Sequence, residues 1–104
     1  ETIEDMEKNE LIGPIVSHAG DGNFHVALLI DKKSDLELKK LDSFLIRISE
    51  RAIRMNGTCT GEHGVGQGKR KYMLKELGGA VDIMKKVKNA FDPNKIMNPG
   101  KLFL

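Results

Sequence analysis

The chain has 104 residues, of which 39% are hydrophobic and 31% are charged, a composition typical of one small globular domain rather than of a disordered segment. Its 17 basic and 15 acidic residues leave a net charge of +2, which gives no reason to expect nucleic acid or an anionic membrane as a partner. No stretch approaches the roughly 20 apolar residues of a membrane span. The single cysteine, Cys59, excludes an internal disulfide and is expected to pack as a small buried side chain.

The first third of the chain predicts a β-hairpin. The polar residues 1–10 lack an initiator methionine, and we interpret them as the end of a helix in a piece cut from a longer chain. Leu11–His18 and Phe24–Ile30 are rich in β-prone apolar residues, and Ala19–Asn23 between them is a dense turn signal. Because proline has no N–H, Pro14 confines the first strand to a sheet edge or to its first residues.

The clearest helix is expected over Ser34–Asn56. Ser34 and Glu37 have the spacing of a capping box, in which each side chain satisfies a free N–H of the first turn. Gly57 then provides a stop. The apolar residues recur in alternating steps of three and four and predict one buried stripe, which comprises Leu38, Leu41, Leu45, Ile48, Ala52 and Met55.

The remaining chain predicts a short strand, a loop and two helices. Thr58–Thr60 is β-prone, and Gly61–Gly68 holds four glycines in eight residues. Helices are expected over Lys69–Leu77 and Ala80–Phe91. One side of the second helix carries Val81, Met84, Val87 and Phe91. This order of elements predicts an α+β fold, a small antiparallel sheet with helices packed on one face.

Three side chains have the types and positions of a metal site. His18 and His25 flank the hairpin loop with six residues between them, so both imidazoles can reach one side of the loop base. Glu62, in the glycine-rich loop, can add a carboxylate. Two histidines and one glutamate leave a coordination position open, which is typical of catalytic rather than structural sites.

His63 follows Glu62 directly. Neighbouring side chains of a regular strand point to opposite faces, so both can face one cavity only where the backbone turns. The glycines of the loop supply the freedom for that turn. An imidazole that does not bind the metal is a natural general base near neutral pH.

Simpler interpretations compete with these. A histidine beside a turn often serves only as a hydrogen-bonding residue, and spacing alone does not decide between that role and metal binding. Asp21 is interpreted as a turn residue rather than a ligand. The run Gly64–Lys69 superficially suggests a phosphate loop, but its spacing matches neither the P-loop nor the dinucleotide fingerprint.

Three motifs carry a family resemblance that covers nearly the whole chain from Pro14. The segments Ser17–His25, Gly57–Gly66 and Phe91–Lys101, in this order, resemble the C-terminal domain of the FAD-linked oxidases. That family includes cytochrome-linked D-lactate dehydrogenases, the D subunit of glycolate oxidase and D-2-hydroxyglutarate dehydrogenases. Thr58–Thr60 before Glu62 looks most similar to the D-lactate and glycolate members.

The resemblance implies roles that spacing did not show. His18, His25 and Glu62 match ligands of a divalent metal, Zn²⁺ or Mn²⁺, and His63 matches the catalytic base. FAD is expected in a separate N-terminal domain that this chain lacks. Residues 1–97 would be the C-terminal part of the substrate-binding cap domain, and residues 98–104 a tail returning toward the FAD domain, with Asn98 as a cofactor contact.

The implied activity is oxidation of a D-2-hydroxy acid, D-lactate or glycolate, to the 2-oxo acid, with hydride transfer to FAD and electrons passing to cytochrome c or a quinone. The isolated chain is expected to be inactive. The resemblance also allows a homodimer and peripheral membrane association of the parent enzyme. It implies a cytoplasmic or inner-membrane location in bacteria and a mitochondrial one in eukaryotes.

Two other functions stay open on the sequence alone. Gly20–Asn23 beside two histidines loosely resembles the loops of metal-dependent hydrolases, although those sites usually need more carboxylates. Alternatively, the histidines of a non-enzymatic module would hold a metal that merely staples the hairpin.

Overall fold

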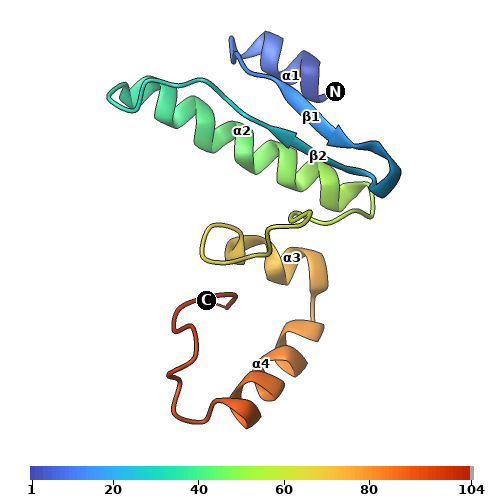
Figure 1. Cartoon of the computed structure of the whole chain (residues 1–104), viewed down its shortest axis with the longest axis vertical. Helices are drawn as coiled ribbons and strands as arrows, with labels where there is room; N and C mark the ends of the chain where they lie inside the picture. Colours follow the sequence, from blue (N-terminus) through green and yellow to red (C-terminus); the bar gives the residue numbers. More distant parts are fainter. Residues whose placement is uncertain (104) are drawn as a thin grey trace.

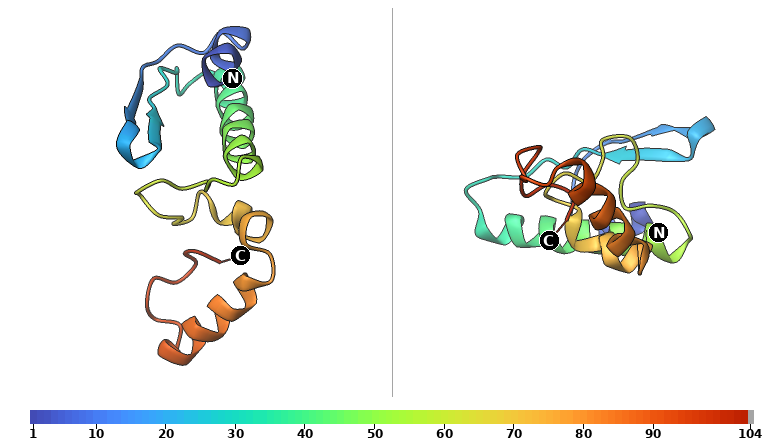
Figure 2. Two further views of the ribbon diagram at one scale, coloured as in Figure 1. Left: turned by 90° about the vertical axis from the view of Figure 1, so that its right-hand side faces the viewer. Right: turned by 90° about the horizontal axis from the view of Figure 1, so that it is seen from below.

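The computed structural model describes residues 1–103 and shows an elongated α+β chain in two parts (Figures 1 and 2). The first part contains α1 (Thr2–Lys8), β1 (Ile15–His18), β2 (Asn23–Val26) and α2 (Asp35–Arg54). The second part contains α3 (Met73–Leu77), α4 (Ala80–Phe91) and the C-terminal tail. The radius of gyration is 16.0 Å, whereas a compact domain of this length has about 13 Å. Within the described residues, no helix is long and apolar enough to cross a membrane.

The predicted hairpin is confirmed, with shorter strands than expected. β1 and β2 pair antiparallel from Ile15↔Val26 to His18↔Asn23, and an isolated bridge joins Ile12 to Leu29. A 3₁₀ turn, Ala19–Asp21, and a left-handed Gly22 connect the strands. The ladder is interrupted at residues 13 and 14 because proline cannot donate a hydrogen bond, although the Pro14 carbonyl still accepts from the Ala27 N–H at 3.1 Å.

Gly13 lets the two strands approach each other closely. A Cβ at this position would overlap the carbonyl oxygen of Ala27 and lie 2.9 Å from its carbonyl carbon and 3.0 Å from Leu28 Cα. All three obstacles are backbone atoms, so a larger residue cannot be accommodated by a change of rotamer. The hairpin therefore needs glycine here for space.

Both ends of α2 are defined by local hydrogen bonds. Ser34 caps the helix by accepting from the Glu37 N–H at 3.3 Å, as predicted. The second half of the predicted capping box is wrong, because the Glu37 carboxylate accepts from the Asp31 N–H instead, at 2.6 Å. At the other end, Asn56 rather than Gly57 takes the left-handed conformation (φ 60°). The Gly57 N–H then bonds the Ala52 carbonyl at 2.8 Å, which completes a Schellman-type ending.

The main core lies between α1, α2 and the hairpin. It comprises Met6, Leu11 and Phe44, with Val26, Leu28 and Ile48 packed against it. Phe44 is 1% exposed and is the centre of this core. The predicted stripe was therefore partly wrong: it omitted Phe44 and included Leu38, Leu45 and Met55, which are exposed. The buried face of α2 is rotated relative to the predicted stripe because both α1 and the hairpin pack on the helix. The spacing of apolar residues predicts a single buried stripe and does not show that two elements cover the helix.

An ion-pair network holds α1 against α2. Arg47 donates to both carboxylate oxygens of Asp5, and Arg51 donates to Asp5 at 2.9 Å and pairs with Glu1 at 3.0 Å. The Asp5 side chain is only 8% exposed. The hydrogen bonds from Arg47 lower the pKa of the Asp5 carboxyl below its ordinary value, against the opposing effect of burial and with further help from Arg51.

The predicted strand at Thr58–Thr60 does not form. This segment has no partner strand among the described residues, and its backbone is bound by a side chain instead: the Cys59 N–H donates to the Glu76 carboxylate at 2.9 Å. Cys59 is buried, as expected, and burial is the main cause that raises the pKa of its thiol to about 11. The thiol is therefore a packing group.

The helix predicted over Lys69–Leu77 begins as a 3₁₀ turn, Arg70–Tyr72, and continues as α3. Buried Tyr72 connects the two parts of the chain, because its hydroxyl donates to the Leu45 carbonyl of α2 at 3.4 Å. On α4, Val81 is buried, but Val87 and Phe91 of the predicted apolar side are exposed.

The tail folds back beside the glycine-rich loop. Buried Asp92 shapes its first turn by accepting from the N–H groups of Ile96 and Met97 at 2.9 and 3.0 Å. Further along, the Leu102 N–H donates to the Gly66 carbonyl at 2.8 Å. Arg70 donates to the Gly100 carbonyl at 3.0 Å. Leu104, the last residue of the predicted tail, lies outside the described residues.

We predict that Gly13→Ala destabilises the fold by about 2 kcal/mol or more, because the strands must separate to admit the methyl group. Gly20→Ala, in the same hairpin but with open space around its Cβ position, is the matched control and should change stability by less than about 0.5 kcal/mol. Urea unfolding of both variants provides the measurement. Equal stabilities would show that the close approach at Gly13 is unimportant.

A second prediction concerns Asp5→Asn, which should lower the free energy of unfolding at pH 7 by on the order of 2 kcal/mol. The folded-state pKa of Asp5 is depressed, so its contribution is fully present above the unfolded pKa of about 4 and is lost as the pH falls through the folded pKa. The difference between wild type and variant should therefore be constant near neutrality and shrink in acid. Exposed Glu4→Gln is the control, and an equal loss in that variant would contradict the prediction.

Candidate metal centre

The hairpin places two imidazoles on one face. His18 ends β1 and pairs with Asn23, while His25 pairs with Val16. Because side chains alternate along a strand, both histidines lie on the face opposite Phe24 and Val26, which are directed toward α2. The two rings lie edge to face with their centroids 5.4 Å apart. The structure thus brings together the two histidines that the sequence paired.

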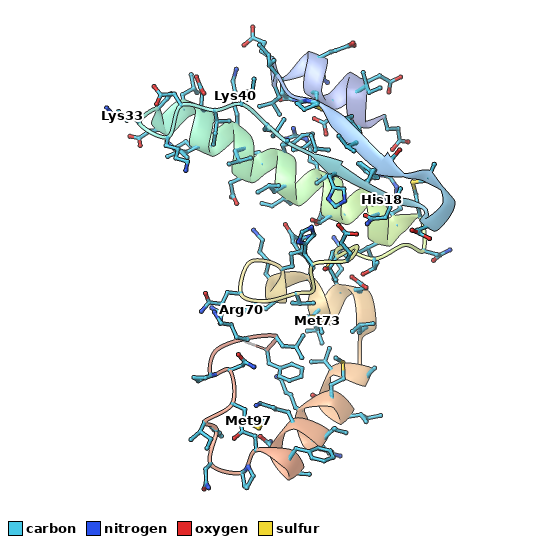
Figure 3. The ribbon with its side chains drawn as sticks, viewed as in Figure 1. His18, Lys33, Lys40, Arg70, Met73 and Met97 are labelled. Atoms are coloured by element: carbon cyan, nitrogen blue, oxygen red, sulfur yellow. The ribbon has the colours of Figure 1, made fainter. Side chains whose placement is uncertain are left out.

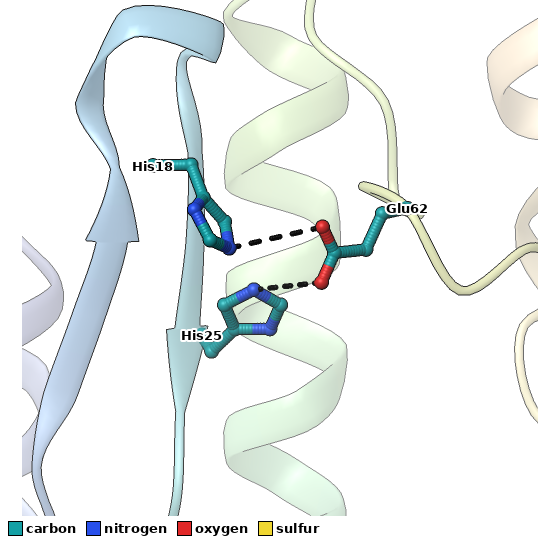
Figure 4. A group of neighbouring side chains, drawn as sticks. All are labelled: His18, His25 and Glu62. Atoms are coloured by element: carbon teal, nitrogen blue, oxygen red, sulfur yellow. Dashed lines mark ion pairs between the residues drawn. The ribbon is translucent and has the colours of Figure 1, made fainter.

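The glycine-rich loop delivers the third side chain. After α2 ends at Arg54, the chain turns back toward the hairpin and carries Glu62 to the histidines (Figure 4). Glu62 Oε1 lies 3.2 Å from His25 Nε2, and Glu62 Oε2 lies 3.8 Å from His18 Nε2. His18, near the hairpin turn, lies above this loop in Figure 3. Residues separated by about 40 positions therefore meet at one point.

These three groups fit a divalent cation. One donor atom from each of His18, His25 and Glu62 lies within 4.8 Å of the other two. Tetrahedral Zn²⁺, with ligands at 2.0–2.2 Å, separates its donor atoms by roughly 3.4 Å, close to the distance between His25 and Glu62. Two nitrogens and one oxygen suit Zn²⁺ or Mn²⁺. The charge of the carboxylate further favours a cation between the rings.

His63 stands beside this cluster. Its Nε2 lies 3.3 Å from Glu62 Oε1, and its ring centroid is 5.6 Å from that of His25. The side chain is 78% exposed, more than either of the other histidines. It does not belong to the group of three mutually close donors. The glycine loop therefore does place a third imidazole next to the carboxylate, as the sequence suggested, with Gly64 in the left-handed conformation just after it (φ 76°).

Sequence reasoning missed a fourth contributor, Asn23. Its side-chain amide donates to Glu62 Oε2 at 3.4 Å. Gly61 leaves room for this amide, because a Cβ there would overlap its oxygen and lie 2.8 Å from its Cγ. The alternation that placed His25 on this face places Asn23 there as well, two residues earlier, so the signal was present.

Two other residues considered from the sequence lie elsewhere. Asp21 is an exposed residue of the 3₁₀ turn, as interpreted, and does not belong to the donor group. Asn98 is exposed in the C-terminal tail, in a left-handed conformation (φ 47°), with its carbonyl accepting from the Lys101 N–H. Met97, its neighbour, marks that position in Figure 3, at the end of the molecule remote from His18.

Comparison with known proteins shows the family to which the chain belongs. The family model described as "FAD linked oxidases, C-terminal domain" matches residues 1–102. The chain is 51% identical over 104 residues, 99% of its length, to D-lactate dehydrogenase [cytochrome] 1, mitochondrial, of Saccharomyces cerevisiae. It is 46% identical over 103 residues, 98% of its length, to the probable mitochondrial D-lactate dehydrogenase of Danio rerio. It is also 46% identical over 89 residues, 83% of its length, to glycolate oxidase subunit GlcD of Bacillus subtilis.

The chain spans only 17%, 21% and 18% of the lengths of these three relatives, respectively. The family-model match nevertheless includes the hairpin, the glycine-rich loop and most of the tail, because it runs from residue 1 to residue 102. The part of the chain that the family model covers includes all four side chains of the candidate centre. The chain belongs to the C-terminal domain family of the FAD-linked oxidases.

Proposed function

We propose that this chain forms the metal-binding and proton-accepting part of a flavin-dependent D-2-hydroxy-acid dehydrogenase. The observation that carries this proposal is the convergence of His18, His25 and Glu62 within 4.8 Å, with His63 beside them, in a member of the FAD-linked oxidase family. The curated relatives named as D-lactate dehydrogenases and glycolate oxidase support oxidation of a small 2-hydroxy acid.

In this proposal His18, His25 and Glu62 hold the cation. A bound Zn²⁺ or Mn²⁺ would supply Lewis-acid polarisation of a hydroxyl or carboxylate oxygen. The two histidines bind through neutral imidazole nitrogens, and His25 Nε2 already faces Glu62. Three protein ligands leave room for substrate oxygens. The role of the hairpin is therefore to fix two donors rigidly, while the loop brings the third.

His63 is proposed as the general base. When its Nε2–H donates to Glu62 Oε1, the lone pair that can accept a proton lies on Nδ1. Glu62 thus orients the His63 ring as well as holding the cation. With Nδ1 directed to the substrate hydroxyl, His63 accepts the proton while the α-carbon loses its hydride. Such general-base assistance is worth on the order of 10²–10⁴-fold in rate.

FAD would supply the acceptor for that hydride and, in this proposal, is bound mainly by a domain outside this chain. His63 is 78% exposed, so the cover that excludes water from the reaction must come from another surface. We propose that residues 1–97 act as part of the cap, that the tail of residues 98–104 runs toward the flavin domain, and that Asn98 contacts the cofactor. Its exposure leaves it free for such a contact.

The proposed substrate, electron acceptor and location are inferred from the names of the relatives. We favour D-lactate or glycolate as substrate, because the relatives' names specify lactate and glycolate. Cytochrome c is proposed as electron acceptor because one name specifies a cytochrome, and a quinone is the alternative acceptor. A mitochondrial location is proposed for a eukaryotic source, since the relatives from yeast and zebrafish are named as mitochondrial. A cytoplasmic or inner-membrane location is proposed for a bacterial source, and a homodimer with peripheral membrane association is proposed for the parent enzyme.

We predict that this chain can replace the matching segment of the yeast D-lactate dehydrogenase, to which it is 51% identical, and that the chimera still reduces its flavin with D-lactate. In the chimera, His63→Ala should slow flavin reduction by about 10²–10⁴-fold and spare metal content. Glu62→Ala should abolish both. Stopped-flow flavin absorbance and elemental analysis measure the two quantities.

Gln67→Ala, in the same loop and exposed, is the matched control and should leave both quantities unchanged. Fast flavin reduction in the His63→Ala chimera would remove His63 as the base. Full activity of the Glu62→Ala chimera without metal would contradict the proposed metal centre. Loss of stability but not of turnover in that variant would instead favour a metal that only staples the hairpin.

A separate prediction is that the isolated chain binds no FAD tightly, because the flavin site is assigned to another domain. Absorbance near the flavin band of the purified chain measures this. Stoichiometric flavin that copurifies with residues 1–104 would contradict the assignment.

A further inference from the structure

Asn23 occupies a position from which it can control Glu62. It lies on β2 two residues before His25 and pairs across the hairpin with His18, so it shares the face of both histidines. Its amide nitrogen reaches Glu62 Oε2 at 3.4 Å. It is half-buried, whereas Glu62 is exposed. Asn23, which is the more buried of the two residues, therefore contacts the more exposed Glu62 side chain.

The two oxygens of Glu62 have different surroundings. Oε1 lies 3.2 Å from His25 Nε2 and 3.3 Å from His63 Nε2. Oε2 faces the Asn23 amide and, at 3.8 Å, His18. An amide that donates to one carboxylate oxygen fixes the rotation of the whole group. The other oxygen, Oε1, is then left directed at His25 and His63.

Gly61 couples this contact to the loop. A Cβ at position 61 would overlap the Asn23 amide oxygen and lie 2.8 and 3.1 Å from its Cγ and Nδ2. The loop backbone therefore packs directly on the amide. The φ of Gly61 is not in the left-handed region, so the Asn23 side chain, rather than the backbone conformation, is what a larger residue at position 61 would have to displace.

We propose that Asn23 is a positioning residue: it holds Glu62 Oε2 so that Oε1 alone is presented to the cation, which makes Glu62 a one-oxygen ligand. This inference rests on the proposed metal centre and assigns it an outer hydrogen-bonding partner. Partners of this kind orient metal ligands, and their loss typically weakens metal affinity by 10–100-fold.

The test is a titration of the full chain with Zn²⁺ and with Mn²⁺, followed by calorimetry. Asn23→Leu keeps the approximate size of the residue but removes the donor, and should weaken affinity by about 10–100-fold without lowering the thermal stability of the metal-free chain. Asn23→Gln, which retains an amide on a longer arm, should recover part of that loss. Ser17→Ala, in the same hairpin but on the opposite face, is the control and should bind as wild type does.

A double-mutant cycle separates this role from a general effect on the loop. Gly61→Ala should weaken binding in the wild-type background by displacing the amide, but should add little once Asn23→Ala has removed the side chain it strikes. If Gly61→Ala costs the same affinity in both backgrounds, or if Asn23→Leu binds both ions as tightly as wild type does, the positioning role is overturned while the metal centre stands. If wild type binds neither ion, the proposed centre and this inference fail together.

Discussion

The packing of the hairpin against α2 around Phe44 is the constraint on which the rest of the structure depends. Phe44 is the residue that joins α1, the hairpin and α2 in one core. That contact decides which face of the hairpin is covered, and the alternation of the strands then leaves His18 and His25 on the other face. The same contact fixes how α2 lies against the hairpin, and so the place beside the hairpin from which the loop with Glu62 starts. A small apolar core thus sets the geometry of a polar site that it does not touch.

The residues of the candidate centre accordingly come from two kinds of segment, the paired strands of the hairpin and the glycine-rich loop. The histidines lie on paired strands, whereas Glu62 and His63 lie on a glycine-rich loop that is held from several sides. The Asn23 amide contacts it at Glu62, and the tail contacts it through Gly66. The network between Asp5 and two arginines stabilises α1 at a distance from this site, so the chemistry and the anchoring of the first helix use separate charged groups.

Local patterns were enough to predict the hairpin, the Ser34 cap and the proximity of His18 to His25, because turn chemistry, side-chain alternation and capping act over a few residues. Residue types alone made Glu62 and His63 candidates, and the family resemblance supplied their expected roles, but nothing in the spacing shows that Glu62 returns to the hairpin across a long helix. Phe44, Gly13 and Asn23 were missed for a common reason. Each derives its role from a neighbour on another segment, and the strand expected at Thr58–Thr60 failed because Glu76 binds that backbone instead.

The length of α2 has a consequence of its own. Its 20 residues rise by 1.5 Å each, so the helix measures about 30 Å and carries the chain back from the far end of the hairpin to its turn (Figure 1). Inserting or deleting one residue would rotate everything that follows by about 100° and swing the carboxylate away from the imidazoles. The number of residues in α2 therefore sets both the distance and the angle between the hairpin half of the site and the loop half.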